Sequence, residues 1–237
     1  RRPQRSTPQL DLNILDYKVK IEKALEIIQK YSPDCFSAFK IFTNSLTLVD
    51  EPGIVSYSLQ SLPGYSNINV VERDDVDLID DLIHENGHHV LNAMLNAEEL
   101  LEEDDDKIFW SPWRNSLRPI RGMYHGYLTF IWAYLLFKDL RSAKKIFTES
   151  QFDKICLRSI EEYYMLEFCH EQLEYAHKQK KITVKGFEIY KMAKAFITKE
   201  KDSVTSAEKE LSPDSLRQIA QLKESLKAAK QKYLNFL

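Results

Sequence analysis

Apolar residues recur at intervals of three and four positions along most of the chain, which is the spacing of one face of an α-helix. Asp74, Asp75 and Asp77 stand where carboxylates cap and charge the first turn of a helix. Pro119 likewise suits a first helical turn. The pattern predicts helices over residues 74 to about 100, 119–134, 152–177, 184–198 and 212–234.

The stretch from about residue 39 to 71 departs from this pattern. Residues 41–49, 54–59 and 67–71 are rich in Val, Ile, Thr and Tyr, and two Pro-Gly pairs punctuate them. We expect a small sheet here. The chain is thus predicted to be mainly α with a small β-sheet (α+β), as a single domain. Its expected parts are the sheet at about 39–71, the helices of a candidate metal site at about 74–137, and a helical C-terminal part at about 150–237, within residues 1–237.

Composition and charge exclude several classes of partner. The chain has 237 residues, of which 43% are hydrophobic, so it can bury a substantial core. Its formal net charge of -3 gives no general attraction to nucleic acid or to anionic lipid. No apolar run is long enough to cross a membrane, and residues 1–10 lack the apolar stretch of a signal peptide. We expect a cytoplasmic protein, with Cys35, Cys156 and Cys169 as reduced thiols.

His84, Glu85 and His88 form an H-E-x-x-H motif inside the predicted helix 74–100. Residues four apart on a helix project from one face about one turn from each other, so both imidazoles can reach one metal ion. Glu85 is expected beside the site. Because a catalytic metal usually takes three protein ligands, the sequence should hold a third.

His125 is the preferred third ligand. It begins an almost wholly apolar stretch that continues through residues 127–137 and should be buried. A buried imidazole needs a partner, and a metal ion would supply it. A hydrogen-bonded core histidine is the alternative for His125. Glu98 and Glu99 are alternative ligands, but they follow His88 by about ten residues and should lie on the same helix.

Two arginines precede His125, namely Arg121 by four residues and Arg118 by seven, so both can share its helical face. A guanidinium beside a metal suits a carboxylate bound bidentately, such as the far end of a dicarboxylate cosubstrate. The alternative is that these arginines pair with the acidic run at residues 102–106.

Three segments together resemble a known family. They are residues 56–64 (SYSLQSLPG), residues 82–88 (LIHENGH), and residues 118–122 (RPIRG) followed by His125-Gly126. The chain resembles, over about residues 56–132, the HExxH-motif proteins of ribosomal peptide natural-product clusters, which are 2-oxoglutarate-dependent peptide β-hydroxylases. The resemblance implies Fe(II) and 2-oxoglutarate as cofactors and a precursor peptide as substrate. It also implies that the three histidines bind iron and that Arg121 or Arg118 binds 2-oxoglutarate, while Glu85 orients a ligand or the substrate.

Two other functions stay open. The order of strands followed by an HExxH helix is also that of zincin-like folds, so the same histidines could hold Zn for a metallopeptidase in which Glu85 is the general base. A non-catalytic helical binding protein, with packed histidines, is the second alternative. Among other residues, Trp110, Trp113 and Tyr124 are candidates for a substrate groove or for core packing. His89 is expected to be a supporting or surface residue, and His170 with His177 to be packed or, less simply, a second metal site.

Overall fold

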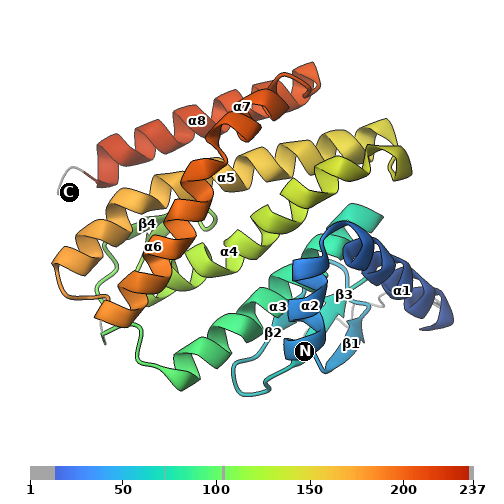
Figure 1. The fold of residues 1–237 in the computed structure, drawn as a ribbon, viewed down its shortest axis with the longest axis horizontal. Helices are drawn as coiled ribbons and strands as arrows, with labels where there is room; N and C mark the ends of the chain where they lie inside the picture. Colours follow the sequence, from blue (N-terminus) through green and yellow to red (C-terminus); the bar gives the residue numbers. More distant parts are fainter. Residues whose placement is uncertain (1–13, 72, 103–104, 235–237) are drawn as a thin grey trace, which may run out of the picture.

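The computed structural model describes residues 14–71, 73–102 and 105–234. The expectation for residues 1–10 and part of the acidic run 102–106 lie outside these ranges. In the described chain, long helices are stacked beside a small sheet (Figure 1), so the prediction of a mainly α fold with a small sheet is confirmed. The likeness to zincin folds stays a prediction.

The first part of the chain builds the sheet and the helix of the HExxH motif. The sheet has the strand order β1-β3-β2, with β1 parallel and β2 antiparallel to β3. Its register places Ser45 opposite Tyr65. The elements are α1 (Ile14–Tyr31), α2 (Pro33–Phe42), β1 (Ser45–Val49), β2 (Tyr57–Ser58), β3 (Tyr65–Asn69) and α3 (Asp75–Ala97).

The strands are shorter than the sequence predicts. Residues 41 and 42, expected in the first strand, end α2, because the buried Cys35, Ala38 and Phe39 have helical spacing and carry the helix into that stretch. Of residues 54–59, only Tyr57 and Ser58 pair with β3. The predicted sheet therefore exists, with three strands and different bounds.

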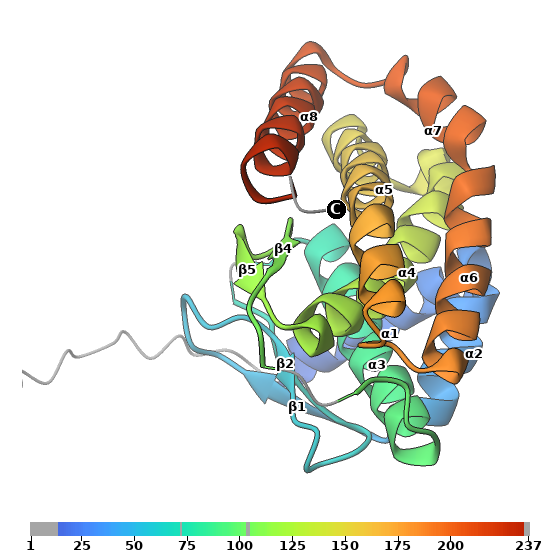
Figure 2. The same ribbon diagram turned by 90° about the vertical axis from the view of Figure 1, so that its left-hand side faces the viewer.

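The second part of the chain supplies the remaining helices and a hairpin that was not predicted. The elements are β4 (Phe109–Ser111), β5 (Ser116–Arg118), α4 (Ile120–Leu140), η1 (Arg141–Ile146), α5 (Glu149–Lys178), α6 (Val184–Lys199), α7 (Lys201–Glu208) and α8 (Pro213–Tyr233). Figure 2 shows the β4–β5 hairpin beside α5 and below α8. The expected helices are present, with ends that differ by a few residues.

Side-chain caps fix where the main helices begin. The Asp77 backbone N–H donates to Asp74 Oδ1 at 2.8 Å, and the Asp74 N–H donates to Asp77 Oδ2 at 3.3 Å. This capping box satisfies two backbone donors that the first turn of α3 cannot satisfy itself. Thr148 and Gln151 form the same arrangement at the start of α5. The predicted capping role of the Asp74 segment is therefore confirmed.

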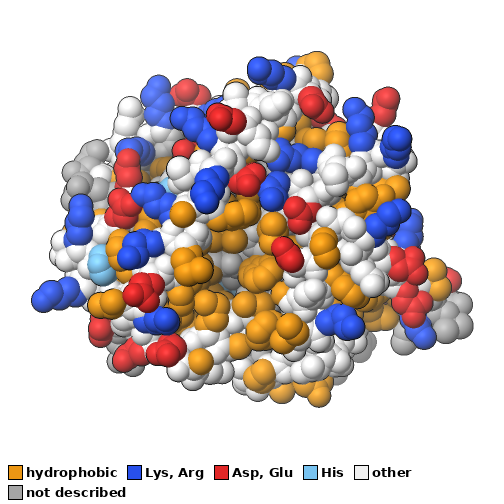
Figure 3. Space-filling model, in the orientation of Figure 1, with side chains coloured by type: hydrophobic (Ala, Val, Ile, Leu, Met, Phe, Trp, Pro, Cys, Tyr) orange, Lys and Arg blue, Asp and Glu red, His pale blue; other side chains and the backbone are white. Residues whose placement is uncertain are grey.

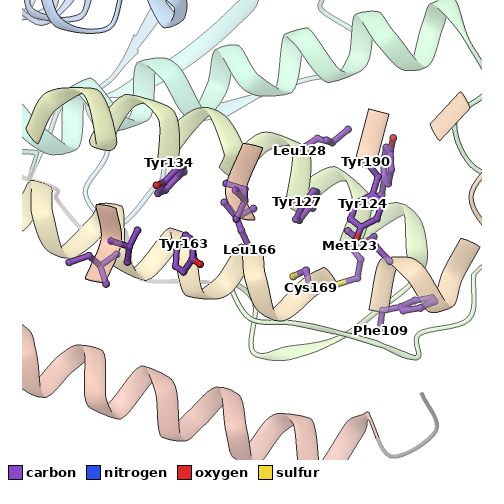
Figure 4. Packing of buried hydrophobic residues seen from close by; sticks show 14 of the residues in the cluster. Phe109, Met123, Tyr124, Tyr127, Leu128, Tyr134, Tyr163, Leu166, Cys169 and Tyr190 are labelled. Carbon is purple, nitrogen blue, oxygen red and sulfur yellow. The ribbon is translucent and has the colours of Figure 1, made fainter. Parts of the chain in front are cut away.

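Helix α4 is apolar on nearly all sides because it packs between two hydrophobic clusters. On one side, Tyr127 and Tyr134 lie against Tyr163 and Leu166 of α5 (Figure 4). On the other side, Ala133 and Phe137 pack among residues of α1, α2, the sheet and α3. Charged side chains surround a largely apolar centre on the face seen in Figure 3. None of the described helices has the length and hydropathy needed to cross a membrane.

A glycine sets how closely α3 approaches α4. A Cβ added at Gly87 would lie 3.2 Å from Trp132 Cδ1 and 3.3 Å from both Thr129 Cγ2 and the Thr129 carbonyl oxygen. Those contacts are tighter than ordinary van der Waals distances, and the carbonyl belongs to the backbone of α4, which cannot yield easily. The absence of a side chain at Gly87 therefore lets the two helices meet at the HExxH motif.

Gly87→Val should lower the free energy of unfolding by about 2 kcal/mol or more, because a branched side chain must push α3 from α4. The matched control is Asn96→Val, which places the same residue on an exposed position of α3 and should change stability by about 0.5 kcal/mol or less. Denaturant unfolding followed by circular dichroism measures both. Equal effects of the two substitutions would contradict the close contact at Gly87.

Candidate metal centre

The structure brings the three predicted histidines together. His84 and His88 lie one turn apart on α3, with ring centroids 4.9 Å apart and ring planes at 86°. His125 reaches them from α4, and its Nε2 lies 2.7 Å from His88 Nδ1. One of these two nitrogens must carry the hydrogen that the other accepts. The Thr129 hydroxyl lies a further 3.4 Å from His88 Nδ1.

Glu85 lies closer to the histidines than the sequence predicts. The potential ligand atoms of His84, Glu85 and His88 all lie within 4.8 Å of one another. Among the described residues, no other group of three potential metal-binding side chains lies this close together. The group contains Glu85 and not His125. The group that meets the distance criterion is therefore not the predicted set of three histidines, and His125 contacts it through the hydrogen bond with His88.

Burial keeps the imidazoles neutral. It lowers the pKa of His84, and it lowers the pKa of His88 to about 2, with the neighbouring histidines adding to the effect. Burial and the Arg121 charge lower the pKa of His125 to about 4. A neutral imidazole has a lone pair available for a metal, so the donor set fits a transition metal ion near neutral pH.

The Glu85 carboxyl supplies a second observation that fits a metal. Its side chain is only 3% exposed, and burial raises its pKa to about 7 against the opposing effect of hydrogen bonds from Ser58. Its Oε2 atom is buried with no hydrogen-bond partner among the described residues. A buried carboxylate oxygen without a partner is costly, and a cation held by the adjacent histidines would compensate it.

Two cavities open at the histidines. The larger has a volume of about 530 Å³, the smaller has a volume of about 410 Å³, and all three histidines line both. Trp113, Arg114 and Phe130 also line both cavities. Their charges differ: three arginines and no Asp or Glu line the smaller cavity, whereas the larger is lined by Asp80, Asp81 and Glu85 together with Arg73, Arg114 and Arg158.

Arg118 and Arg121 both line the smaller cavity, although they reach it from different elements. Arg121 lies in the first turn of α4, and its Nη2 donates to Gln60 Oε1 at 3.4 Å. Arg118 ends β5, so the expectation that it shares the helical face of His125 is wrong. The physical reason is Pro119, which disfavours helical geometry in the residue before it. Arg118 instead packs over Gly122, where an added Cβ would lie 3.1 Å from its Nε.

Among the described residues, the two arginines do not pair with the acidic run, and neither alternative glutamate ligand lines the cavities at the histidines. Asp106 of the acidic run lies 3.5 Å from Lys181, and neither Arg118 nor Arg121 forms an ion pair in the described ranges. Glu98 and Glu99 lie beyond the end of α3 and line neither of the two cavities at the histidines.

The β4–β5 hairpin brings Trp113 and Arg114 to the histidines. Trp113 was a candidate for the groove, and Arg114 was missed. A turn over residues 112–115 carries both, with Asn115 in the left-handed region at a φ of 48°. Pro112 and Asn115, typical turn residues, are the signal that could have found this hairpin.

A buried polar network holds Trp113. Its Nε1 donates to Glu162 Oε2 at 2.7 Å, and its ring stacks on Phe130 with centroids 4.5 Å apart and planes at 3°. The Phe130 ring lies 4.7 Å from that of His84. Arg158 lies 3.6 Å from Glu162 and donates to Asp80 at 2.7 Å. Complete burial raises the pKa of Glu162 to about 8, against the opposing effects of the Arg158 charge and the hydrogen bond from Trp113.

Other candidates have structural roles. Trp110 stacks on Tyr233 at 4.2 Å, and the buried Tyr124 hydroxyl donates to the Gly186 carbonyl. His89 is buried: it accepts from the Gly64 backbone N–H at Nδ1, so its Nε2–H faces the Ser66 hydroxyl at 2.9 Å. His170 and His177 have separate contacts: His170 forms a hydrogen bond with the Tyr127 hydroxyl, and His177 stacks on Phe187.

Comparison of the chain with protein-family models and with curated proteins gives no match. The function is therefore argued from the site itself.

Changing His84, His88 or His125 to Ala should lower the affinity for a divalent transition metal by more than about tenfold, because each removes one donor from the cluster. His177→Ala is the matched control, since His177 stacks on Phe187 and lines neither cavity. Metal content after dialysis, measured by inductively coupled plasma mass spectrometry, gives the result. Unchanged metal content in His125→Ala would remove His125 from the site.

Glu162→Gln should change how stability depends on pH. Because the folded pKa is about 8 and the model-compound value is 4.5, the folded state retains a proton that the unfolded state loses. The free energy of unfolding should therefore fall as pH rises from about 5 to 8, by roughly 1 to 3 kcal/mol. Glu162→Gln cannot ionise and should flatten this slope. Metal-free protein unfolded in denaturant at several pH values tests this, and identical slopes would contradict a protonated Glu162.

Proposed function

We propose that this protein is an Fe(II)- and 2-oxoglutarate-dependent hydroxylase that installs a β-hydroxyl group on a side chain of a ribosomally made precursor peptide. His84, His88 and His125 would hold the iron. Arg121, with Arg118 as the alternative, would bind 2-oxoglutarate. The resemblance of residues 56–132 to peptide β-hydroxylases and the charge distribution around the histidines support the same assignment.

The charge of the smaller cavity is the observation that carries the proposal. It adjoins all three histidines, and the residues that line it include three arginines but no carboxylate. Such a wall attracts an anion and disfavours a cationic or acceptor-poor ligand. 2-Oxoglutarate is a dianion, and its volume is well within about 410 Å³. A bound diacid would place one end at the histidines and the other end at Arg121 or Arg118.

The bound iron and cosubstrate would supply an oxidant strong enough to hydroxylate a C–H bond. In the balanced reaction, 2-oxoglutarate, O2 and the peptide C–H group give succinate, CO2 and the C–OH group, with one oxygen atom of O2 in succinate and one in the hydroxyl. The protein's own residues position these reactants. Neutral imidazoles provide the donor atoms, the arginines orient the diacid, and the stacked Trp113 and Phe130 form an apolar wall that excludes water.

The larger cavity has the features expected for the peptide. It is lined by residues 55–58, which include β2, and it reaches the same histidines. Its charged walls are mostly paired internally, since Asp81 lies 3.1 Å from Arg73 and Asp80 lies 2.7 Å from Arg158. A peptide could then approach the metal from one side while the cosubstrate occupies the other.

One observation favours the zinc metallopeptidase as a second candidate. Glu85 lies with His84 and His88 in one group, and burial raises its pKa to about 7, which suits a general base near neutral pH. In a hydroxylase, the same carboxyl would orient the iron's ligands or the peptide. Zinc-dependent peptide cleavage that disappears in Glu85→Gln would favour the peptidase over the proposed hydroxylase.

Arg121→Ala should weaken the binding of 2-oxoglutarate by well over tenfold, because it removes a charge-assisted bidentate contact worth about 2 kcal/mol or more. Arg121→Lys should recover only part of the affinity, since an ammonium lacks the planar fork. Iron content should not change. The affinity for 2-oxoglutarate is measured at matched iron loading. The conversion of 2-oxoglutarate to succinate by the iron-loaded protein is measured alongside it.

The same series is repeated with Arg118→Ala, because both arginines line the cavity. Unaltered affinity in both variants would show that these arginines do not bind the cosubstrate. Failure of the unchanged, iron-loaded protein to form succinate with any peptide would count against the hydroxylase as a whole.

A further inference from the structure

The turn between β4 and β5 has its backbone fixed beside the histidines. Trp113 anchors it, through the hydrogen bond from Nε1 to Glu162 and the stacking on Phe130. The indole also packs against Gly126, where an added Cβ would lie 3.4 Å from Trp113 Cε3, an ordinary van der Waals distance. Pairing of Ser111 with Ser116 closes the turn at its base. Arg114 follows the anchored indole directly, so its backbone position is set by the core.

Like Arg118, which lines only the smaller cavity, Arg114 has no hydrogen-bond or ion-pair partner among the described residues. Its side chain is exposed and lines both cavities. Among the residues that the structure describes, none forms a hydrogen bond or ion pair with it, whereas Arg158 binds Asp80, Arg73 lies against Asp81, and Arg121 donates to Gln60.

We infer that Arg114 binds a carboxylate group of a ligand at the junction of the two cavities. The inference rests on the proposed function, because it assigns a recognition residue to the same site. A guanidinium recognises a carboxylate through two parallel hydrogen bonds, and a fixed backbone lowers the entropy lost on binding. The carboxylate has two possible sources: the distal end of 2-oxoglutarate in the smaller cavity, or an acidic side chain of the peptide in the larger cavity.

The experiment compares pairs of probes that differ by one carboxylate. The first pair is 2-oxoglutarate and 2-oxopentanoate, and the second is the N-acetyl methylamides of aspartate and asparagine. Affinities for zinc-loaded protein, in which no oxidation occurs, are measured by calorimetry for the unchanged protein and Arg114→Gln. The preference for the acidic member of one pair should fall by about tenfold in the variant. The pair that responds identifies the source of the carboxylate.

Controls separate recognition from folding and from the proposed function. Arg217→Gln alters an exposed arginine of α8 that lines neither cavity, and it should leave both preferences unchanged. Trp113→Phe keeps an aromatic ring but removes the donor to Glu162, so it should weaken the same preference that Arg114→Gln weakens. The inference is overturned if the preference for the acidic probe is the same in the unchanged protein and in Arg114→Gln for both pairs. The absence of any preference in both proteins counts as the same result. If the unchanged protein fails to bind 2-oxoglutarate, the proposed function is contradicted, while the aspartate pair still tests Arg114.

Discussion

The candidate site depends on the contact between α3 and α4 at Gly87. Because this residue has no side chain, the helices approach until His88 Nδ1 and His125 Nε2 lie 2.7 Å apart. The same contact is part of the packing of α4, which is buried against α3 on one side and α5 on the other. The positions of the donor atoms are thus fixed by the core and not by loops, which is the arrangement that holds a reactive centre in a constant geometry.

The two cavities at the histidines differ in the charges that line them. Burial lowers the pKa of each imidazole and favours its uncharged form, which is the form that can donate to a metal ion. In the smaller cavity, arginines without carboxylates favour an anion. In the larger cavity, most charges are matched by ion pairs. The proposed reaction, with an anionic cosubstrate and a separate, larger substrate, would match this asymmetry. A zinc peptidase would use the histidines and Glu85 and has no anionic cosubstrate.

Much of the fold and the centre of the site could be predicted, because their signals are local. Helical periodicity and the Asp74 cap locate α3, and the spacing of His84 and His88 fixes their common face. The apolar run after His125 predicts burial of that part of the chain, and His125 itself is half-buried. The hairpin could not be found by periodicity, since each strand has three residues. The contact between Trp113 and Glu162 joins residues 49 positions apart, and no local pattern encodes it.

The most direct test of the account is an anaerobic titration of the Fe(II)-loaded protein with 2-oxoglutarate, followed by optical absorption. Chelation of iron by the keto acid gives a metal-to-ligand charge-transfer band. We expect a band that saturates at one 2-oxoglutarate per iron and is lost in His125→Ala together with the iron. Stoichiometric iron bound by the histidines, with no such band at saturating 2-oxoglutarate, would contradict it.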